Sequence, residues 1–215
     1  MEPFIVSAPD LLQGLGTTIL LGVTSFLLGL LLGGVIALAR ISRFRVLNAV
    51  AIGYVSVFRG TPLLIQIMLV YYGLPQFGLR ILPIPSAIVT FTLYAAAYLS
   101  ESLRAGVLAV DKGQWEAATS LGMTHIRSLR RVIAPQALRN AVPAIGDRFV
   151  VLMKDTSLAS VITVVELTRV AETTGSSSFR YVEAFLTAAL VYWCVNGALS
   201  LAQLLLERRM RRACA

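Results

Sequence analysis

Four charged side chains interrupt an apolar segment, and their spacing suits the binding of a charged solute. The segment runs from Ala137 to Val165 and contains the pairs Asp147-Arg148 and Lys154-Asp155. On a helix, residues seven apart share a face, so Asp147 lies with Lys154 and Arg148 with Asp155. Ionisable groups at membrane depth are costly unless they pair or line water. The pattern therefore indicates either a polar path or internal ion pairs.

Lys154, Asp155, Thr156 and Ser157 follow one another and carry groups that suit a solute with charges of both signs. Lys154 can meet a carboxylate, and Asp155 can meet an ammonium. If Asp155 or Thr156 caps a helix start, free N–H groups and hydroxyls add donors for the carboxylate. A helix broken at membrane depth is a common way to build a substrate site. We take these four residues as candidate substrate-binding residues; ion pairing that only stabilises the bundle is the alternative.

A second polar group lies within an apolar segment that runs from Leu47 to Tyr72. It contains Arg59, Thr61 and Gln66, and Pro62 beside them weakens the helix. A buried arginine faces a cavity or a partner, which makes Arg59, Thr61 and Gln66 further candidates for substrate binding. The alternative is that the long side chain of Arg59 reaches the cytoplasmic surface, where its charge stays hydrated.

The chain lacks the groups that catalysis or nucleotide binding would require. It contains no Gly-Lys pair and therefore no P-loop. A Ser-His-Asp arrangement is absent, Cys194 and Cys214 lie far from any metal-ligand spacing, and His125 is the single histidine. We expect a transport subunit rather than an enzyme, with no cofactor or metal bound by this chain and any ATP bound by a partner.

Composition places the chain in a lipid bilayer. Of its 215 residues, 57% are hydrophobic and only 14% are charged, and its mean hydropathy is +0.77. Soluble domains carry about 25% charged residues. The net charge of +8 is concentrated between apolar stretches, which is typical of membrane topology rather than nucleic-acid binding. We expect an integral membrane protein made of one domain, residues 1–215, in contact with lipid and without a nucleic-acid partner.

Five apolar stretches are long enough to cross a bilayer, which takes ~20 residues in a helix. Lys and Arg gather at one end of these stretches, and the positive-inside rule puts that end in the cytoplasm and the N-terminus outside. Residues Glu166–Arg180 are polar, with Thr173–Ser178 forming an outer loop, and the pair Glu101 and Arg104 forms a local salt bridge. The expected fold is an all-α bundle with a cytoplasmic C-terminus and spans at Leu11–Ala39, Leu47–Tyr72, Ile84–Leu108, Ala137–Val165 and Ala184–Leu206.

The longest polar, basic interval is Asp111–Pro135, between the third and fourth spans. Asp111 caps a helix start, and Gly122 ends that helix as a C-terminal glycine does. A second short helix follows, with apolar side chains on one face and arginines on the other, and Pro135 ends it. Two short helices joined by a glycine form a compact cytoplasmic knob, which is a surface for another protein to bind.

This interval resembles the EAA motif of ABC transporter permease subunits, with the family's spacing kept. Its residues are Glu116, Ala117, Ala118, Gly122 and Pro135, together with Val132 and Ala134, which replace the family's Ile and Leu. Further phrases extend the resemblance over nearly the whole chain, to the polar amino-acid permeases of the histidine/glutamine type: FRGTP, GQWEAA, PQA and KDTSL. The phrases most similar to the cystine permease subgroup are YYGLPQFG, PIPSA, DKGQWEAA and KDTSLA.

The resemblance implies the fold of type I ABC importer permeases, with five spans per subunit and a second copy or a paralogue as partner. It also implies two ATPase subunits, which bind ATP and Mg, and an extracytoplasmic amino-acid-binding protein at a bacterial inner membrane. Residues Lys154–Ser157 would contact substrate, and Glu116, Ala117, Ala118, Gly122 and Pro135 would couple to the ATPase. The expected function is ATP-driven import of polar amino acids, L-cystine first. An ion-gradient-driven secondary transporter is the alternative, although the internal repeats of that class are not found.

Overall fold

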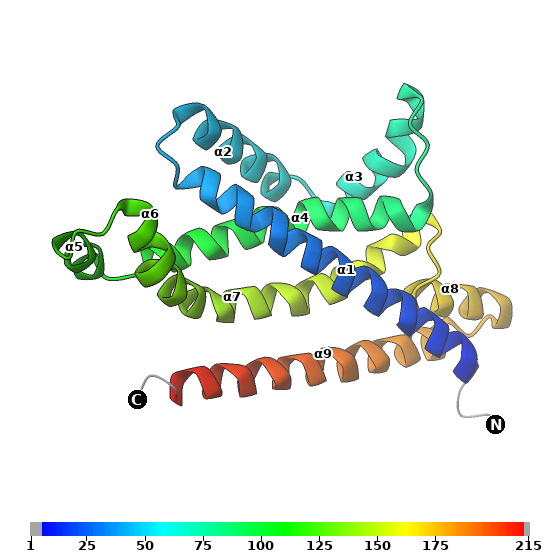
Figure 1. The fold of residues 1–215 in the computed structure, drawn as a ribbon. Helices are drawn as coiled ribbons and strands as arrows, with labels where there is room; N and C mark the ends of the chain where they lie inside the picture. The colour runs from blue at the N-terminus through cyan, green and yellow to red at the C-terminus, as the bar shows by residue number, and fades with distance from the viewer. Residues whose placement is uncertain (1–5, 213–215) are drawn as a thin grey trace.

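The computed structural model describes residues 6–212, with side chains up to residue 210, and Cys214 lies outside this range. All regular structure in this range is helical (Figure 1). The elements, in chain order, are α1 (Ala8–Arg40), α2 (Arg45–Gly60), α3 (Leu63–Met68), η1 (Leu69–Gly73), η2 (Leu74–Phe77), α4 (Pro83–Leu108), α5 (Lys112–Ser120), α6 (His125–Ser128), η3 (Leu129–Ile133), α7 (Ala134–Asp155), η4 (Thr156–Ile162), α8 (Leu167–Ser178) and α9 (Tyr181–Arg212).

Within residues 6–212, three helices are long and apolar enough to cross a membrane: α1, α4 and α9. They contain the first, third and fifth predicted spans, each helical throughout. The bent pair of α2 with the α3–η2 segment raises the number of candidate spans to four. Helix α7, with 22 residues, is long enough to cross a membrane but is not apolar enough by the same measure, because five charged side chains lie along it.

The predicted span from Leu47 to Tyr72 is broken at its Gly-Pro segment, more sharply than the weakened helix that the sequence indicated. The axes of α2 and of the segment after it differ by 102° at the break between Gly60 and Leu63. Thr61 is extended, with φ −116° and ψ 145°, as expected for the residue before a proline. Pro62 also lacks the N–H that would continue the helix.

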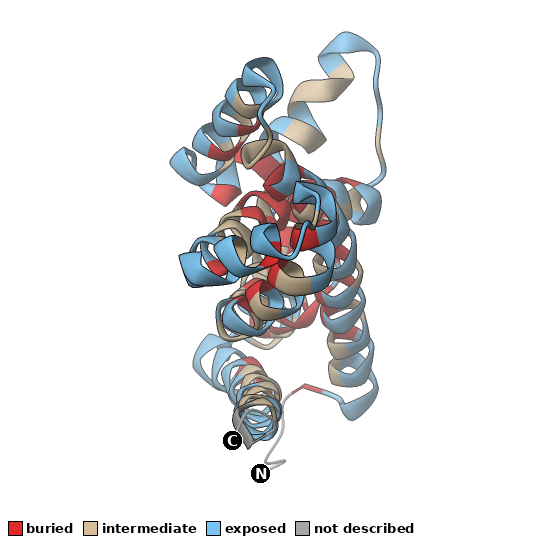
Figure 2. Ribbon diagram, turned by 60° about the vertical axis from the view of Figure 1, so that its left-hand side comes forward, coloured by how far each residue is buried: buried red, intermediate tan, exposed pale blue. Residues whose placement is uncertain are grey.

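Helix α1 packs along α4, and two glycines on α1 allow the close approach. A Cβ atom added to Gly29 would lie 2.9 Å from the Cβ of Ala95, and one added to Gly33 would lie 3.0 Å from the carbonyl oxygen of Ala96. Small residues at helix contacts are a common means of packing in membranes. Buried residues gather where α1, α4 and α7 meet (Figure 2), and the core there includes Leu21, Ile67, Phe91, Leu99 and Leu152.

The residues predicted to form an outer loop, Thr173–Ser178, are the second half of helix α8, and their position outside the membrane stays a prediction. Glu166 is fully buried and caps α8, because its carboxylate accepts hydrogen bonds from the N–H groups of Thr168 at 2.9 Å and Arg169 at 2.8 Å. The hydroxyl of Tyr192 on α9 donates to the same carboxylate at 2.7 Å. One acidic side chain therefore begins α8 and ties it to α9.

Candidate functional site

A polar cavity of about 300 Å³ lies between α2, α4 and α7. Its wall contains charged groups of both signs, which is expensive among apolar helices unless water or a solute is present. The lining residues are Arg59, Tyr98, Glu101, Ser102, Ala144, Asp147, Arg148 and Val151. Of the residues that the sequence nominated for substrate binding, Arg59 alone lies in this wall.

Three arginines from three helices surround Glu101 on α4. Arg40 at the end of α1 hydrogen-bonds to one carboxylate oxygen, and Arg104 donates to the other at 2.5 and 3.1 Å. The guanidinium of Arg59 lies 3.9 Å from the first oxygen. The predicted salt bridge between Glu101 and Arg104 is confirmed. The contact with Arg40 joins positions 61 residues apart, which the local sequence pattern does not indicate.

Tyr98 forms the aromatic side of the cavity. The guanidinium carbon of Arg148 lies 3.7 Å from the centre of its ring, and that of Arg59 lies 5.1 Å from it. An arginine over an aromatic face is stabilised by the negative potential of the ring. The ring also packs on Tyr94, with the two centroids 4.9 Å apart. Tyr98 was missed as a cavity residue, although its place one helical turn before Glu101 puts both on one face.

The ion pairs suggested by the seven-residue spacing are absent from the described residues. Asp147 instead accepts a hydrogen bond of 2.8 Å from the side-chain amide of Gln203 on α9. Arg148 lies over Tyr98, as described above. The Oδ2 atom of Asp155 is buried and has no hydrogen-bond partner in the described part of the chain. Packing against α4 and α9, rather than pairing within α7, thus determines the directions of these charges.

The side chains of residues Lys154–Ser157 do not line a common cavity. Lys154 and Ser157 line a second cavity of about 420 Å³, shared with Thr168, Phe185, Ala188, Ala189 and Tyr192. Asp155 is half-buried, and the charges of both Arg148 and Lys154 act on it. Thr156 is completely buried. The four adjacent candidates therefore cannot contact one small solute together in this conformation.

The prediction of a helix start at Asp155 or Thr156 is wrong. The N–H of Thr156 donates to the carbonyl oxygen of Leu152, so the helix continues and passes into the 3₁₀ turn η4. The hydroxyls of Thr156 and Ser157 donate to the carbonyl oxygens of Met153 and Lys154, each at 2.8 Å. Hydroxyls that bond back to the preceding turn are locally satisfied. The free N–H donors expected for a carboxylate are consequently not provided here.

Gln66 and Thr61 hold the bend between α2 and α3. The side-chain amide of Gln66 donates to the carbonyl oxygens of Phe58 at 3.0 Å and Thr61 at 3.1 Å, and to the Thr61 hydroxyl at 2.8 Å. These bonds satisfy carbonyl groups that the end of α2 leaves without helical partners. The geometry gives both side chains a bracing role, and their contact with substrate stays a prediction.

The knob formed by α5 and α6 has the local chemistry expected for its first helix. The carboxylate of Asp111 accepts a hydrogen bond of 2.7 Å from the N–H of Gly113. Gly122 has φ +73°, and its N–H and that of Met123 donate to Thr119 and Ala118 at 2.9 and 3.1 Å. This paired bonding is the Schellman motif. Asp111 as N-terminal cap and Gly122 as C-terminal glycine are therefore confirmed.

The motif residues Glu116 and Ala117 are exposed on the outer face of α5, while Ala118 is buried. Trp115 stacks on His125 of α6, with ring centroids 5.0 Å apart and an interplanar angle of 17°. The stack fixes the two short helices relative to each other. A polar, exposed face on a rigid helix pair suits docking to another protein.

The prediction that Pro135 ends the second short helix is wrong. α6 passes through the π-helical turn η3 directly into α7, and Pro135 lies in the first turn of α7. The N–H of Ala134 donates to the carbonyl oxygen of Leu129, five residues earlier. The wider π turn lets the proline ring avoid the carbonyl groups of the preceding turn.

Comparison with known proteins agrees with this architecture. Residues 26–212 match the family described as binding-protein-dependent transport system inner membrane component. Over 205 residues the chain is 45% identical to the L-cystine transport system permease protein TcyB of Bacillus subtilis (strain 168), covering 95% of this chain and 88% of that protein.

Two solved structures share the fold. An amino acid ABC transporter crystallised with histidines has a chain of 41% sequence identity and a TM-score of 0.90, covering 94% of both chains. The MetNI methionine ABC transporter in an inward-facing conformation has a TM-score of 0.76 at 20% identity, covering 95% of this chain and 99% of that one. The second comparison supports the fold alone.

Proposed function

Since this chain belongs to the family of binding-protein-dependent transport system inner membrane components and is the permease component of an amino-acid ABC importer, we propose that it carries L-cystine. Family members of this kind have no ATPase site of their own. The 45% identity to an L-cystine permease supports the substrate, as do the cystine-type phrases in the sequence.

The observation that carries the proposal is the polar cavity between α2, α4 and α7. L-Cystine bears two carboxylates and two ammonium groups. The cavity wall contains Arg59 and Arg148 as cations and Asp147 as an anion, beside Glu101, whose carboxylate is already bound by Arg40 and Arg104. In a site of low dielectric each solute charge needs a partner, because an unpaired charge there costs several kcal/mol. A wall with both signs of charge meets this requirement.

We retain Lys154 and Asp155 as proposed substrate contacts. Lys154 lines an open cavity and has no ion pair among the described residues, and Asp155 has a buried oxygen without a hydrogen-bond partner. Lys154 would meet a solute in the cavity beside α9, and Asp155 is the next residue in the chain and is acted on by the charge of Arg148, which lines the cavity beside α4. Ser157 lies beside Lys154 in the first of these cavities. Thr156 and Thr61 are less suited, because their hydroxyls donate to backbone carbonyl groups. The amide nitrogen of Gln66 is bound within the bend, but its buried side-chain oxygen has no hydrogen-bond partner in the described part of the chain and stays available to a solute.

The proposal includes the partners that such an importer requires. Two ATPase subunits, which bind ATP and Mg, dock on the α5–α6 knob through the exposed face that carries Glu116. An extracytoplasmic binding protein delivers the solute, and a second permease copy or a paralogue completes the path. The assembly lies in a bacterial inner membrane. A secondary transporter driven by an ion gradient is disfavoured by the family, and ATP-independent uptake by the chain alone would support it.

Five membrane spans with the N-terminus outside form part of the proposal. Three helices qualify by length and apolar composition, a bent pair adds a fourth, and α7 with its charges facing neighbouring helices would be the remaining one. Single cysteines introduced at His125, Gln76 and Ser177 test the orientation with membrane-impermeant reagents. We expect His125 to label from the cytoplasm and the other two from outside. Labelling of Ser177 and His125 from the same side would contradict five spans.

The substrate is tested by uptake into proteoliposomes that contain the complete complex and internal ATP. We expect labelled L-cystine to accumulate and unlabelled L-cystine to compete better than arginine, glutamine or histidine. Accumulation of a different amino acid with no competition by L-cystine would disprove the substrate and leave the importer class intact.

A further inference from the structure

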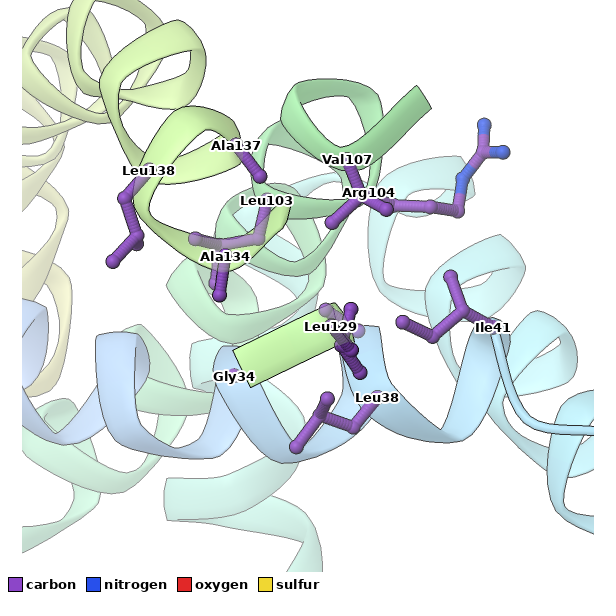
Figure 3. A pocket seen from close by; sticks show the side chains of 11 residues that line it. Gly34, Leu38, Ile41, Leu103, Arg104, Val107, Leu129, Ala134, Ala137 and Leu138 are labelled. Atoms are coloured by element: carbon purple, nitrogen blue, oxygen red, sulfur yellow. The ribbon is translucent and has the colours of Figure 1, made fainter. Parts of the chain in front are cut away.

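Two cavities at the basic end of the bundle lie side by side and share part of their walls. A cavity of about 140 Å³ lies between α1, α4 and the start of α7 (Figure 3), and one of about 670 Å³ lies between α1, α4 and the α5–α6 knob. They share four lining residues: Leu38, Ile41, Val107 and Leu129. We call the combined space the basic-end groove, with the smaller cavity as its inner part and the larger one as its mouth.

The inner part of the groove is lined by hydrocarbon. Leucine, isoleucine, valine, alanine and glycine form its wall, and Arg104 is the one charged residue among them. The guanidinium of Arg104 points away from the neighbouring leucines and bonds to Glu101 (Figure 3). Gly34 keeps the floor open, since nothing lies within 4 Å of a Cβ atom added there. An open space with an apolar wall of this kind suits part of an acyl chain.

The mouth of the groove is positively charged. Arg43 and Lys112 both line it, and none of the acidic residues in the described part of the chain does. Neither side chain forms an ion pair within the described residues. The aromatic pair Trp115 and His125 forms another side of the mouth. Tryptophan is enriched where protein meets lipid headgroups.

The groove lies at the depth where a bilayer changes from hydrocarbon to headgroups. The charge-free part of α1 ends at Ala39, just before Arg40, and Leu38 and Ile41 line the groove on either side of that boundary. The apolar inner part therefore lies level with the acyl chains, and the cations of the mouth lie level with the phosphates. Under the orientation proposed above, this is the cytoplasmic leaflet, which carries anionic lipids.

We propose that the basic-end groove binds one anionic phospholipid, with an acyl chain in the inner part and the phosphate between Arg43 and Lys112. The charge of the mouth selects this occupant. A zwitterionic lipid brings its own cation toward Arg43 and Lys112, and a soluble phosphate compound has no hydrocarbon for the inner part. Basic pockets between helices at the cytoplasmic surface are a known form of anionic lipid site.

Native mass spectrometry of the purified full chain, titrated with phosphatidylglycerol or phosphatidylcholine of identical acyl chains, tests the proposal. We expect phosphatidylglycerol to bind about 30-fold more tightly, as two cations near a headgroup would give at about 1 kcal/mol each. Arg43→Gln/Lys112→Gln should remove this preference. Gly34→Leu, which fills the inner part, should weaken the binding of both lipids.

Two matched variants serve as controls. Arg208→Gln/Arg209→Gln removes the same charge from exposed positions on α9, and Gly16→Leu makes the same change elsewhere on α1, where an added Cβ atom also meets nothing within 4 Å. Both should bind lipid as the unchanged chain does. The proposal is overturned if the unchanged chain binds the two lipids with equal affinity. It is also overturned if the α9 variant loses the preference for phosphatidylglycerol as fully as Arg43→Gln/Lys112→Gln does, or if a folded Gly34→Leu variant binds lipid as the unchanged chain does. The assay involves no ATPase and no transport, so its outcome is independent of the transported solute.

Discussion

The guanidinium of Arg148 on α7 lies 3.7 Å from the centre of the Tyr98 ring on α4, so an aromatic face from one helix holds a cation of the next against the polar cavity. Arg59 approaches the same ring at 5.1 Å. Tyr98 is thus the residue that both cavity cations have in common. Its ring positions the guanidinium groups of Arg59 and Arg148, which the proposed solute would meet, so Tyr98 is a positioning residue.

We expect Tyr98→Leu to lower uptake by the reconstituted complex about 5- to 30-fold, because a cation–π contact away from water contributes about 1–2 kcal/mol. Tyr98→Phe keeps the ring and should retain most of the activity. The measurement is the initial rate of labelled L-cystine uptake in proteoliposomes. If Tyr98→Phe is as inactive as Tyr98→Leu, the hydroxyl rather than the ring is important, and the cation–π explanation fails.

Gln66 provides a test that separates bracing from substrate contact. Gln66→Leu removes three hydrogen bonds across the bend, each contributing about 1 kcal/mol, and should lower the unfolding temperature as well as uptake. Thr61→Ala removes only one of these bonds and should have a smaller effect. Gln76→Leu at an exposed position is the matched control. An unchanged unfolding temperature with lost uptake would instead favour substrate contact by Gln66.

The predictions that the structure confirms concern contacts within one or two helical turns. Asp111 caps the start of α5, Gly122 ends it, and the Glu101–Arg104 salt bridge follows from helical spacing. The break at Pro62 is equally local, but the sequence shows a weakened helix and not the 102° turn, which depends on Gln66 folding back onto Phe58.

The polar cavity depends on contacts that no local pattern contains. Arg40 and Glu101 meet because α1 packs on α4, and Asp147 meets Gln203 because α9 lies beside α7. Adjacent residues on α7 then turn to different neighbours, which is why Lys154 and Asp155 lie apart despite their positions in sequence. The two charged pairs on α7 indicated a polar region, and Asp147 and Arg148 do line the polar cavity. Which groups the four charged side chains contact is determined by the packing of α7 against its neighbours.

Gly122 is the position of the knob most sensitive to substitution. Its φ of +73° is a conformation that a β-branched residue adopts only with strain of roughly 1–2 kcal/mol. Gly122→Val should therefore distort the Schellman turn and reduce substrate-stimulated ATP hydrolysis by the full complex, while the helices still insert. Gly53→Val on α2, where an added Cβ atom meets nothing within 4 Å, is the matched control. Normal stimulated hydrolysis in Gly122→Val would contradict a coupling role for this turn.

Lys154 and Asp155 allow the proposed solute path to be distinguished from a purely structural role. Neither residue forms an ion pair in the described part of the chain, so removing either charge should not leave a broken salt bridge behind. We expect Lys154→Ala and Asp155→Ala to lower uptake about 30-fold or more, since loss of a charged hydrogen-bonded contact costs on the order of 2–5 kcal/mol. Insertion and ATPase assembly should be unchanged. Ser157→Ala, whose hydroxyl bonds to its own helical turn, should be much milder.

The charge-swapped variant Asp147→Lys/Lys154→Asp gives the decisive comparison. If Asp147 and Lys154 acted as a structural pair, the swap would restore both expression and uptake. Because Asp147 accepts its hydrogen bond from Gln203 on α9, the swap should instead lose that contact and place a cation beside Arg148. We therefore expect the swapped variant to transport no better than Lys154→Ala. Recovery of uptake would show that the two charges pair during the transport cycle and would refute substrate contact by Lys154.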